Sequence, residues 1–491
     1  MRAGRVTIHI LPNDVLLLIF LFDGLEDEDV DPRRCLPWHR LVHVCQRWRS
    51  LVFSSPKFLD LRLVCGPWAE RGTGNELFTS AIWPPLPVLL RRGCYAEEWE
   101  NTSRYFDAAI VDPTRVREID LTLTRSPLAD LVLAMDKPFP ALTCFRLALD
   151  RGLKFQERYS APALTGRFLG GSAPNLQYLE LYSIEFRALP ELLLSATNLV
   201  CLSLSAIPRY GHICPMVMST GLAALAKLQW LTIDYKSSIS CPDPHSPLPT
   251  RTILPALTHF VFHGTREYVE DFVSSIDAPL LHDTRINFFQ QPISDIPQLT
   301  QFMRRTTRFE PFNEVHVDFA FFRVLVGNFL PTRDDDDDDD EIFRFRISAE
   351  LYTDTNAWHS SLAFLVSIFP FVSIAKHIYL EGSKYSTSQW RTNLENTEWL
   401  EMFYPFTALE NLYIFKAFAR RIAPALQKLV EGRVTEVLPT LQNIFLEGVQ
   451  PSESGPIQEV IEKFVAARQL SGHPITVSLW ERCSDSDSDD D

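Results

Sequence analysis

Two cysteines and two histidines near the N-terminus form the densest group of metal-binding side chains in the sequence. Cys35, His39, His43 and Cys45 lie within eleven residues, and the two histidines are four residues apart. Imidazoles at positions i and i+4 of a helix can share a zinc ion, which takes four nitrogen or sulfur ligands. Cys45 shares a helix face with Trp48 instead, and four ligands cannot converge from one straight helix. We therefore interpret the histidines as a surface pair and predict no metal site.

The motifs of the common catalytic and nucleotide-binding sites are absent from the sequence. It contains no GxGxxG, GxxxxGK[ST], GxSxG or HExxH pattern. Gly170-Gly171-Ser172 lacks the strand and helix that would make it a phosphate loop. The seven aspartates at 334–340 lack the spaced ligands and turn glycines of a calcium loop. We expect no enzyme activity, and no catalytic, cofactor-binding or metal-binding residue.

Two acidic tracts carry most of the net charge. The 491 residues have a formal net charge of −15, and twelve aspartates lie in residues 334–340 and 485–491. Without them the net charge is −3, which gives no general attraction to nucleic acid or to an anionic membrane. Because like charges repel, we expect a disordered Asp-rich insertion at about 331–341. The acidic Ser/Asp tail at 481–491 is either a kinase substrate or a solubilising tail.

The cysteine content and hydropathy pattern indicate the cellular compartment. Nine cysteines are scattered along the chain without a CxxC pair, as in proteins that keep reduced thiols in the cytoplasm or the nucleus. No apolar run reaches the ~18–20 residues that span a bilayer. Residues 1–10 lack the apolar stretch of a secretory signal. We expect a cytoplasmic or nuclear protein, or one found in both compartments.

Residues 10–53 have the pattern of a small helical unit. Pro12-Asn13-Asp14 is typical of a helix start. A second helix is predicted over about 37–53, with these residues on one face: Trp38, Leu41, Val42, Cys45, Trp48 and Val52. About 45 residues bury too little surface to be secure alone. The unit is therefore either a cap on the next domain or a docking module that a partner completes.

The order of these residues resembles the F-box family, in which a Leu-Pro pair, an aliphatic helix ending in Ile-Phe and a Val-Cys-basic-Trp-Arg helix follow one another. The matching segments are 11–20, LPNDVLLLIF, and 41–49, LVHVCQRWR. The resemblance implies that the helices dock on a Skp-type adaptor, which a cullin joins to a RING subunit. Carried over position by position, the partner-binding residues are Leu11, Pro12, Ile19, Phe20, Leu41, Cys45 and Trp48.

A second pattern, L-x-x-φ-x-φ with φ apolar, recurs along the rest of the chain. In φ-x-φ, alternate side chains face one side, so each copy predicts a short strand. First positions lie 23–34 residues apart, and one interval of 63 hides a further strand at 342–347. The copies are Val116/Ile119/Leu121, Leu142/Phe145/Leu147, Leu176/Leu179/Leu181, Leu199/Leu202/Leu204, Leu228/Leu231/Ile233, Leu257/Phe260/Phe262, Leu281/Thr284/Ile286, Phe312/Val315/Val317, Ala375/Ile378/Leu380, Leu409/Leu412/Ile414 and Leu441/Ile444/Leu446.

Strand, turn and helix at this period resemble leucine-rich repeats. The family's Asn or Cys after the strand is absent, so we expect an irregular solenoid. The alternative is an ordinary α/β domain with leucine-rich strands. The predicted fold class is α/β: an F-box at 1–64, a connector at 65–112, and a solenoid of short parallel strands alternating with helices at 113–480. Its solvent-facing strand positions, such as Tyr178, Glu180, Gln229 and Thr232, would select an unknown protein substrate.

Two functions remain open from the sequence. The first is a substrate-recognition adaptor of an SCF-type E3 ubiquitin ligase, which docks through the F-box and binds substrate through the repeats. The second is a repeat scaffold for protein–protein interaction that forms no ligase, with the F-box-like helices acting as a cap. The sequence predicts neither nucleic-acid nor membrane binding.

Overall fold

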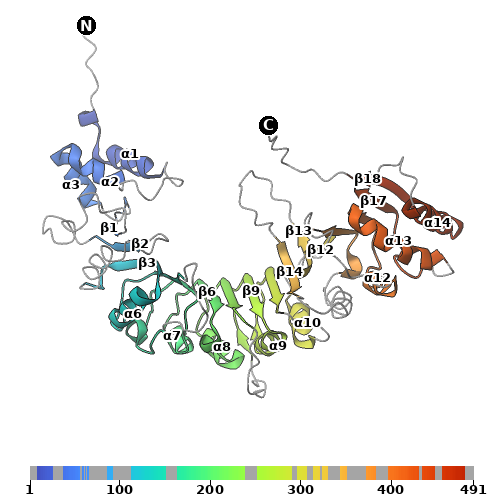
Figure 1. The fold of residues 1–491 in the computed structure, drawn as a ribbon. Coiled ribbons are helices and arrows are strands. Elements are labelled where there is room, and N and C mark those ends of the chain that lie inside the picture. Colours follow the sequence, from blue (N-terminus) through green and yellow to red (C-terminus); the bar gives the residue numbers. More distant parts are fainter. Residues whose placement is uncertain are drawn as a thin grey trace, which may run out of the picture. The chain divides into compact units, whose positions relative to one another are not determined.

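A computed structural model gives two compact units, residues Met1–His212 and Ile213–Asp491 (Figure 1). The structure describes residues 8–25, 37–55, 58–59, 61, 63–65, 86–91, 112–150, 163–237, 251–289, 296–306, 313–320, 323–329, 343–350, 372–382, 396–430, 434–447 and 456–480. The predicted Asp-rich insertion, the acidic tail and Cys35 lie outside these residues.

The first unit begins with three helices, α1 (Asn13–Leu25), α2 (Pro37–Val44) and α3 (Gln46–Ser54), preceded by a short 3-10 turn, η1 (Ile8–Ile10). The prediction of one helix over about 37–53 is wrong at Cys45. This residue is extended, with φ −160° and ψ 168°, and its sulfur accepts a hydrogen bond from the Trp48 backbone N–H at 3.4 Å. A side chain that caps a new helix ends the previous one, because an extended backbone cannot continue it.

Six parallel strands follow in chain order in the first unit. They are β1 (Leu63–Cys65), β2 (Val88–Arg91), β3 (Val116–Leu123), β4 (Cys144–Leu149), β5 (Tyr178–Tyr182) and β6 (Cys201–Ile207). Helices α6 (Arg125–Ala134) and α7 (Leu189–Leu193) and the short η4 (Phe168–Gly171) and η5 (Arg209–Gly211) lie between strands. The sheet starts with β1, at the end of the predicted F-box, and it continues through the predicted connector, where Val88, Leu89 and Leu90 are buried and pair with β3.

The second unit has parallel strands alternating with helices, interrupted once. In spatial order the strands are β7 (Trp230–Tyr235), β9 (His259–Gly264), β11 (Asp283–Phe288), β14 (Phe343–Glu350), β13 (Arg323–Phe329), β12 (Glu314–Ala320), β15 (His377–Gly382), β16 (Asn411–Ile414), β17 (Asn443–Glu447) and β18 (Thr476–Trp480). The helices are α8 (Pro215–Leu222), α9 (Arg266–Ser274), α10 (Pro297–Arg305), α12 (Asn396–Phe403), α13 (Lys416–Val430) and α14 (Pro456–Leu470), with the short η6 (Val372–Ile374). Strands β8 (Thr252–Ile253) and β10 (Ile276–Asp277) form a separate parallel pair.

The interruption lies at β13, which is antiparallel to both neighbours. Strand β14 contains the predicted hidden strand, but it pairs with β11, out of chain order. A hairpin-like reversal from β12 into β13 and a second one into β14 insert two strands between β11 and β12. Strand prediction from alternating residues is therefore confirmed here, whereas the expected chain-order, all-parallel arrangement is wrong at this position.

The two φ positions of every copy fall on a strand of the sheet, from β3 to β17, and the first position of one copy, Phe312, lies outside the described residues. The two φ positions point into the core: Leu179 and Leu181 of β5, for example, are 0% and 3% exposed. The first position closes a turn before the strand, as where the Leu176 N–H donates to the Ala173 carbonyl at 3.2 Å. Burial of the leucine and the turn hydrogen bond together fix where each strand begins.

A buried arginine ties the last helix to the segment before β17. Arg468 of α14 is fully buried, and its guanidinium donates to the carbonyls of Val434, Leu438, Pro439 and Leu441 at 3.0–3.3 Å. Burial lowers the pKa of this group. An unpaired buried cation is costly, so the four carbonyls are what allows Arg468 to lie there.

Candidate functional site

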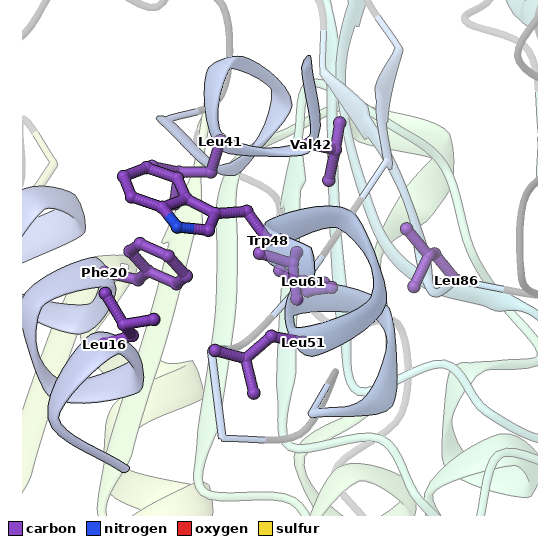
Figure 2. Packing of buried hydrophobic residues seen from close by; sticks show 9 residues of the cluster. Leu16, Phe20, Leu41, Val42, Trp48, Leu51, Leu61 and Leu86 are labelled. Carbon is purple, nitrogen blue, oxygen red and sulfur yellow. The ribbon is translucent and has the colours of Figure 1, made fainter. Parts of the chain in front are cut away.

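The N-terminal helices enclose a small core of their own, and several predicted docking residues belong to it (Figure 2). Phe20 of α1 and Trp48 of α3 pack with ring centroids 4.7 Å apart. Phe20, Trp48 and Leu41 are only 3%, 8% and 9% exposed. Leu61 and Leu86, which follow the helices in the chain, join the same cluster. These rings and side chains therefore stabilise the unit from within.

Polar contacts explain the remaining residues of the motif. Arg47 donates from Nη2 to the Leu11 carbonyl at 2.6 Å and to Asn13 Oδ1 at 2.8 Å. Arg49 donates to the Val42 carbonyl at 2.9 Å, at the end of α2. With Cys45 capping α3, the Cys-x-Arg-Trp-Arg stretch joins all three helices. The sequence pattern thus encodes the packing of the helices, and α3 holds the start of α1 in place.

The seven predicted partner-binding residues divide into three groups in the structure. Phe20, Leu41 and Trp48 are buried, and Leu11 and Cys45 pack half-buried against the core. Pro12 and Ile19 are exposed, Ile19 at 41%. The exposed and half-buried members are accessible to a partner, whereas the buried ones pack inside the unit. Their role in docking stays a prediction.

A stripe of exposed apolar side chains runs along α1, and the sequence reasoning identified only part of it. Val15, Leu18, Ile19 and Phe22 recur at i, i+3, i+4 and i+7, which places them on one side of the helix. Leu18, Ile19 and Phe22 are 47%, 41% and 63% exposed, whereas Leu16 and Phe20 on the other side are buried. We call Val15, Leu18, Ile19 and Phe22 the α1 stripe. Extending the helical spacing in the sequence from Ile19 to Phe22 would have identified the whole stripe.

The solvent-facing strand positions of the first unit are polar and charged. Arg146 of β4 donates to Glu180 of β5 at 3.0 Å and lies 3.7 Å from Asp120 of β3. Tyr178 and Tyr182 of β5 are exposed at 39% and 52%. The predicted selectivity positions Tyr178 and Glu180 lie on β5 of this unit and Thr232 lies on β7 of the second unit, whereas Gln229 comes just before β7; all four are exposed or half-buried. Whether they select a substrate stays a prediction.

Two cysteines near these strands are poorly suited to nucleophilic chemistry. Burial raises the pKa of Cys144 to about 12 and that of Cys201 to about 11. A thiol attacks as its thiolate, which is scarce at neutral pH when the pKa is this high. These two thiols are therefore structural.

In the second unit, β7, β9 and β11 carry a histidine–carboxylate group. His259 stacks on Trp230 with centroids 3.6 Å apart, and its Nε2 lies 4.0 Å from Asp283 Oδ2. Burial, with smaller effects of His282 and Arg285, lowers the pKa of His259 to about 4. Burial raises the pKa of Asp283 to about 6, against the opposing effect of Arg285. Near pH 5 both groups are therefore largely uncharged.

Strands β15 to β18 carry two rows of side chains on their solvent side. At the strand starts, Asn411 Nδ2 contacts His377 Nδ1 at 3.0 Å, Asn443 donates to Asn411 at 2.7 Å, and Thr476 donates to Asn443. These four residues are successive register partners. These contacts give polar side chains on neighbouring strands hydrogen-bond partners, and they stabilise the register of the strands.

Two residues further along the strands lies what we call the aromatic row: His316, Tyr379, Tyr413 and Phe445. Neighbouring rings are stacked, with centroids 4.3–4.4 Å apart and planes within 11°. Each ring is half-buried and lies at the position between the two buried apolar residues of its strand. Trp480, at the end of β18, packs near Tyr379 and Tyr413, with ring centroids 6.0 and 5.5 Å apart.

Among the described residues, no group of histidine, cysteine or acidic side chains is placed to hold a metal ion. No helix in the same part of the chain is long and apolar enough to cross a membrane. No protein-family model and no curated protein matches this sequence. Functional assignment therefore depends on the residues themselves.

Proposed function

We propose that this chain is a substrate-recognition adaptor of an SCF-type E3 ubiquitin ligase. It would dock on a Skp-type adaptor through an F-box formed by α1–α3, and the cullin and RING subunits would join through that adaptor. The strands and helices that follow would act as a leucine-rich-repeat-like solenoid that binds the protein substrate. Catalysis then belongs to other subunits, in the cytoplasm or the nucleus.

The observation that carries the proposal is the α1 stripe. A helix that is apolar on all sides is normally buried on all sides. Here Leu16 and Phe20 are buried in the core and Leu17 packs half-buried against it, whereas Leu18, Ile19 and Phe22 remain exposed. Apolar side chains at i, i+3, i+4 and i+7 are the anchors of a helix that enters a groove on a partner. The stripe lies within the segment 11–20 and just beyond it, where the F-box resemblance expects docking.

The second candidate function, a repeat scaffold capped by these helices, is favoured by a different observation. Leu61 and Leu86 share the core of Phe20 and Trp48. The helices are thus packed against the segment that leads into the sheet, as a cap would be. A capping role explains why Leu61 and Leu86 share this core, but it does not explain why the α1 stripe is exposed.

The test measures binding of the purified full-length chain to a purified Skp-type adaptor by isothermal titration calorimetry. Replacing Ile19 or Phe22 by aspartate places a charge in an apolar contact, and we expect at least tenfold weaker binding with an unchanged melting temperature. The matched control is Leu133→Asp, because Leu133 is 73% exposed on α6 of the same unit. Equal binding of all three variants and the wild type, or no binding by any, would overturn the docking proposal.

A further inference from the structure

The aromatic row has a geometry that leaves particular ring surfaces accessible. Tyr413 is covered on its two faces by Tyr379 at 4.3 Å and by Phe445 at 4.4 Å. Trp480 is inclined by 70° to Tyr413, with ring centroids 5.5 Å apart, and it lies against the ring edge of Tyr413 because both faces of that ring are covered.

The row ends at Phe445. The register partner of Phe445 on β18 is Ser478, which has no ring to continue the stack. Phe445 and Trp480 are both half-buried. The outer face of Phe445 and the indole of Trp480 are thus the aromatic surfaces that a ligand would meet at this end of the row. The faces of aromatic rings carry negative electrostatic potential and attract cations, Arg and Lys above all.

The charge of the second unit points to the same kind of ligand. Residues 213–491 contain 23 basic and 38 acidic residues, a net charge of −15, and twelve of the acidic residues lie in the tracts at 334–340 and 485–491. The second tract begins five residues after Trp480 in the sequence, whereas residues 1–212 contain 24 basic and 24 acidic residues and are neutral. Acidic tracts attract basic partners and repel acidic ones. The aromatic row therefore belongs to the acidic unit, whereas the exposed tyrosines of β5 belong to the neutral one.

From these observations we propose that the aromatic row and Trp480 bind an arginine- or lysine-rich protein segment. One cationic side chain stacks on the outer face of Phe445 or on the indole of Trp480, and the acidic tracts attract the segment at longer range. Aromatic residues are the commonest energetic centres of protein interfaces, and half-buried rings lose little conformational freedom on binding. The inference rests on the proposed function only in treating the bound protein as a ligase substrate.

The test uses the full-length chain without the Skp-type adaptor. The probes are two fluorescein-labelled synthetic peptides, one alternating arginine with serine and the other alternating glutamate with serine. Fluorescence anisotropy gives the affinity of each. We expect at least tenfold tighter binding of the arginine peptide, weakened by added salt because the attraction is screened.

Leucine replacements separate the ring faces from general charge and from folding. Trp480→Leu and Phe445→Leu keep apolar bulk but remove the aromatic face, and we expect about tenfold weaker binding of the arginine peptide. Tyr182→Leu, at an exposed position on β5 of the neutral unit, is the matched control and should bind as the wild type does. Melting temperatures identify any variant whose fold is damaged, and Tyr413→Phe, which keeps the stack, should bind normally.

Two results would overturn the inference. One is equal affinity for the arginine and the glutamate peptides. The other is unchanged binding of the arginine peptide by both Trp480→Leu and Phe445→Leu, which would assign binding to the acidic charge alone. The variant Phe22→Asp keeps the whole second unit, so it should bind the arginine peptide normally even where it no longer binds the Skp-type adaptor. Failure of one proposal is therefore distinguishable from failure of the other.

Discussion

Trp48→Ala should destabilise the N-terminal helices without destabilising the rest of the chain. A buried Trp side chain removes ~150–250 Å² from water, which at ~25 cal/mol per Å² amounts to ~4–6 kcal/mol. An extended reference chain overstates this value, and measured Trp→Ala losses are ~3–5 kcal/mol. The indole N–H of Trp48 is buried without a hydrogen-bond partner among the described residues. Removing this unpaired N–H regains ~1 kcal/mol or more of the free energy of unfolding. The net loss of stability is therefore about 2–4 kcal/mol.

Hydrogen–deuterium exchange with mass spectrometry measures this loss in the intact chain. Amide protection in α1 and α3 follows the free energy of local unfolding. A loss of about 2–4 kcal/mol lowers protection about 30- to 1,000-fold, while β3 to β6 should keep theirs. Phe22→Ala is the control, because Phe22 is 63% exposed and its truncation should cost less than ~0.5 kcal/mol. A change of less than about fivefold in Trp48→Ala would refute the assignment of Trp48 to the core.

Three further predictions concern other contacts. Arg47→Met should lower amide protection at the start of α1 by about tenfold, because it removes the hydrogen bonds to Leu11 and Asn13. The pKa of Asp283, about 6, lies above its ordinary value, so proton uptake by the folded state raises the free energy of unfolding as the pH falls from 6 to 4. The pKa of His259, about 4, lies below its ordinary value, so proton uptake by the unfolded state lowers the free energy of unfolding as the pH falls from 6.5 to 4. On acidification, the melting temperature of Asp283→Asn should therefore fall progressively further below that of the wild type, and that of His259→Gln should rise progressively above it. A difference in melting temperature that does not change with pH across this range would contradict the pKa assignments. Arg468→Met leaves four carbonyls without their donor and should cost about 3 kcal/mol, measured by urea unfolding, with wild-type stability as the contrary result.

The strands could be predicted from the sequence because their signal is local. Apolar residues two positions apart, with a leucine three positions before them, mark β3 to β17 wherever the template occurs. Buried φ positions and a turn at the first leucine are sufficient to define each strand. The order of β14, β13 and β12 could not be predicted in this way, since pairing between distant segments leaves no mark in the local pattern. The break at Cys45 was missed because Cys45 fits the helical spacing, although its sulfur caps the next helix.

The interaction surfaces were predictable only in part. The docking residues carried over from the F-box resemblance include core residues such as Phe20 and Trp48. A sequence motif contains residues that pack inside the unit as well as residues on its surface, and it does not distinguish the two kinds. The aromatic row is also marked in the sequence. Tyr379, Tyr413 and Phe445 occupy the same x position of three successive φ-x-φ copies, and residues at one template position of parallel strands become neighbours.

The displaced strand order has a consequence for synthesis of the chain. In the finished sheet β11 pairs with β14, while β12 pairs with β13 and β15. From Phe288 at the end of β11 to Glu350 at the end of β14 the ribosome must add 62 residues. At ~5–20 residues per second this takes about 3–12 s, during which β11 has an unpaired edge. Unpaired edges recruit other strands, so this interval is when the nascent chain most needs protection from aggregation.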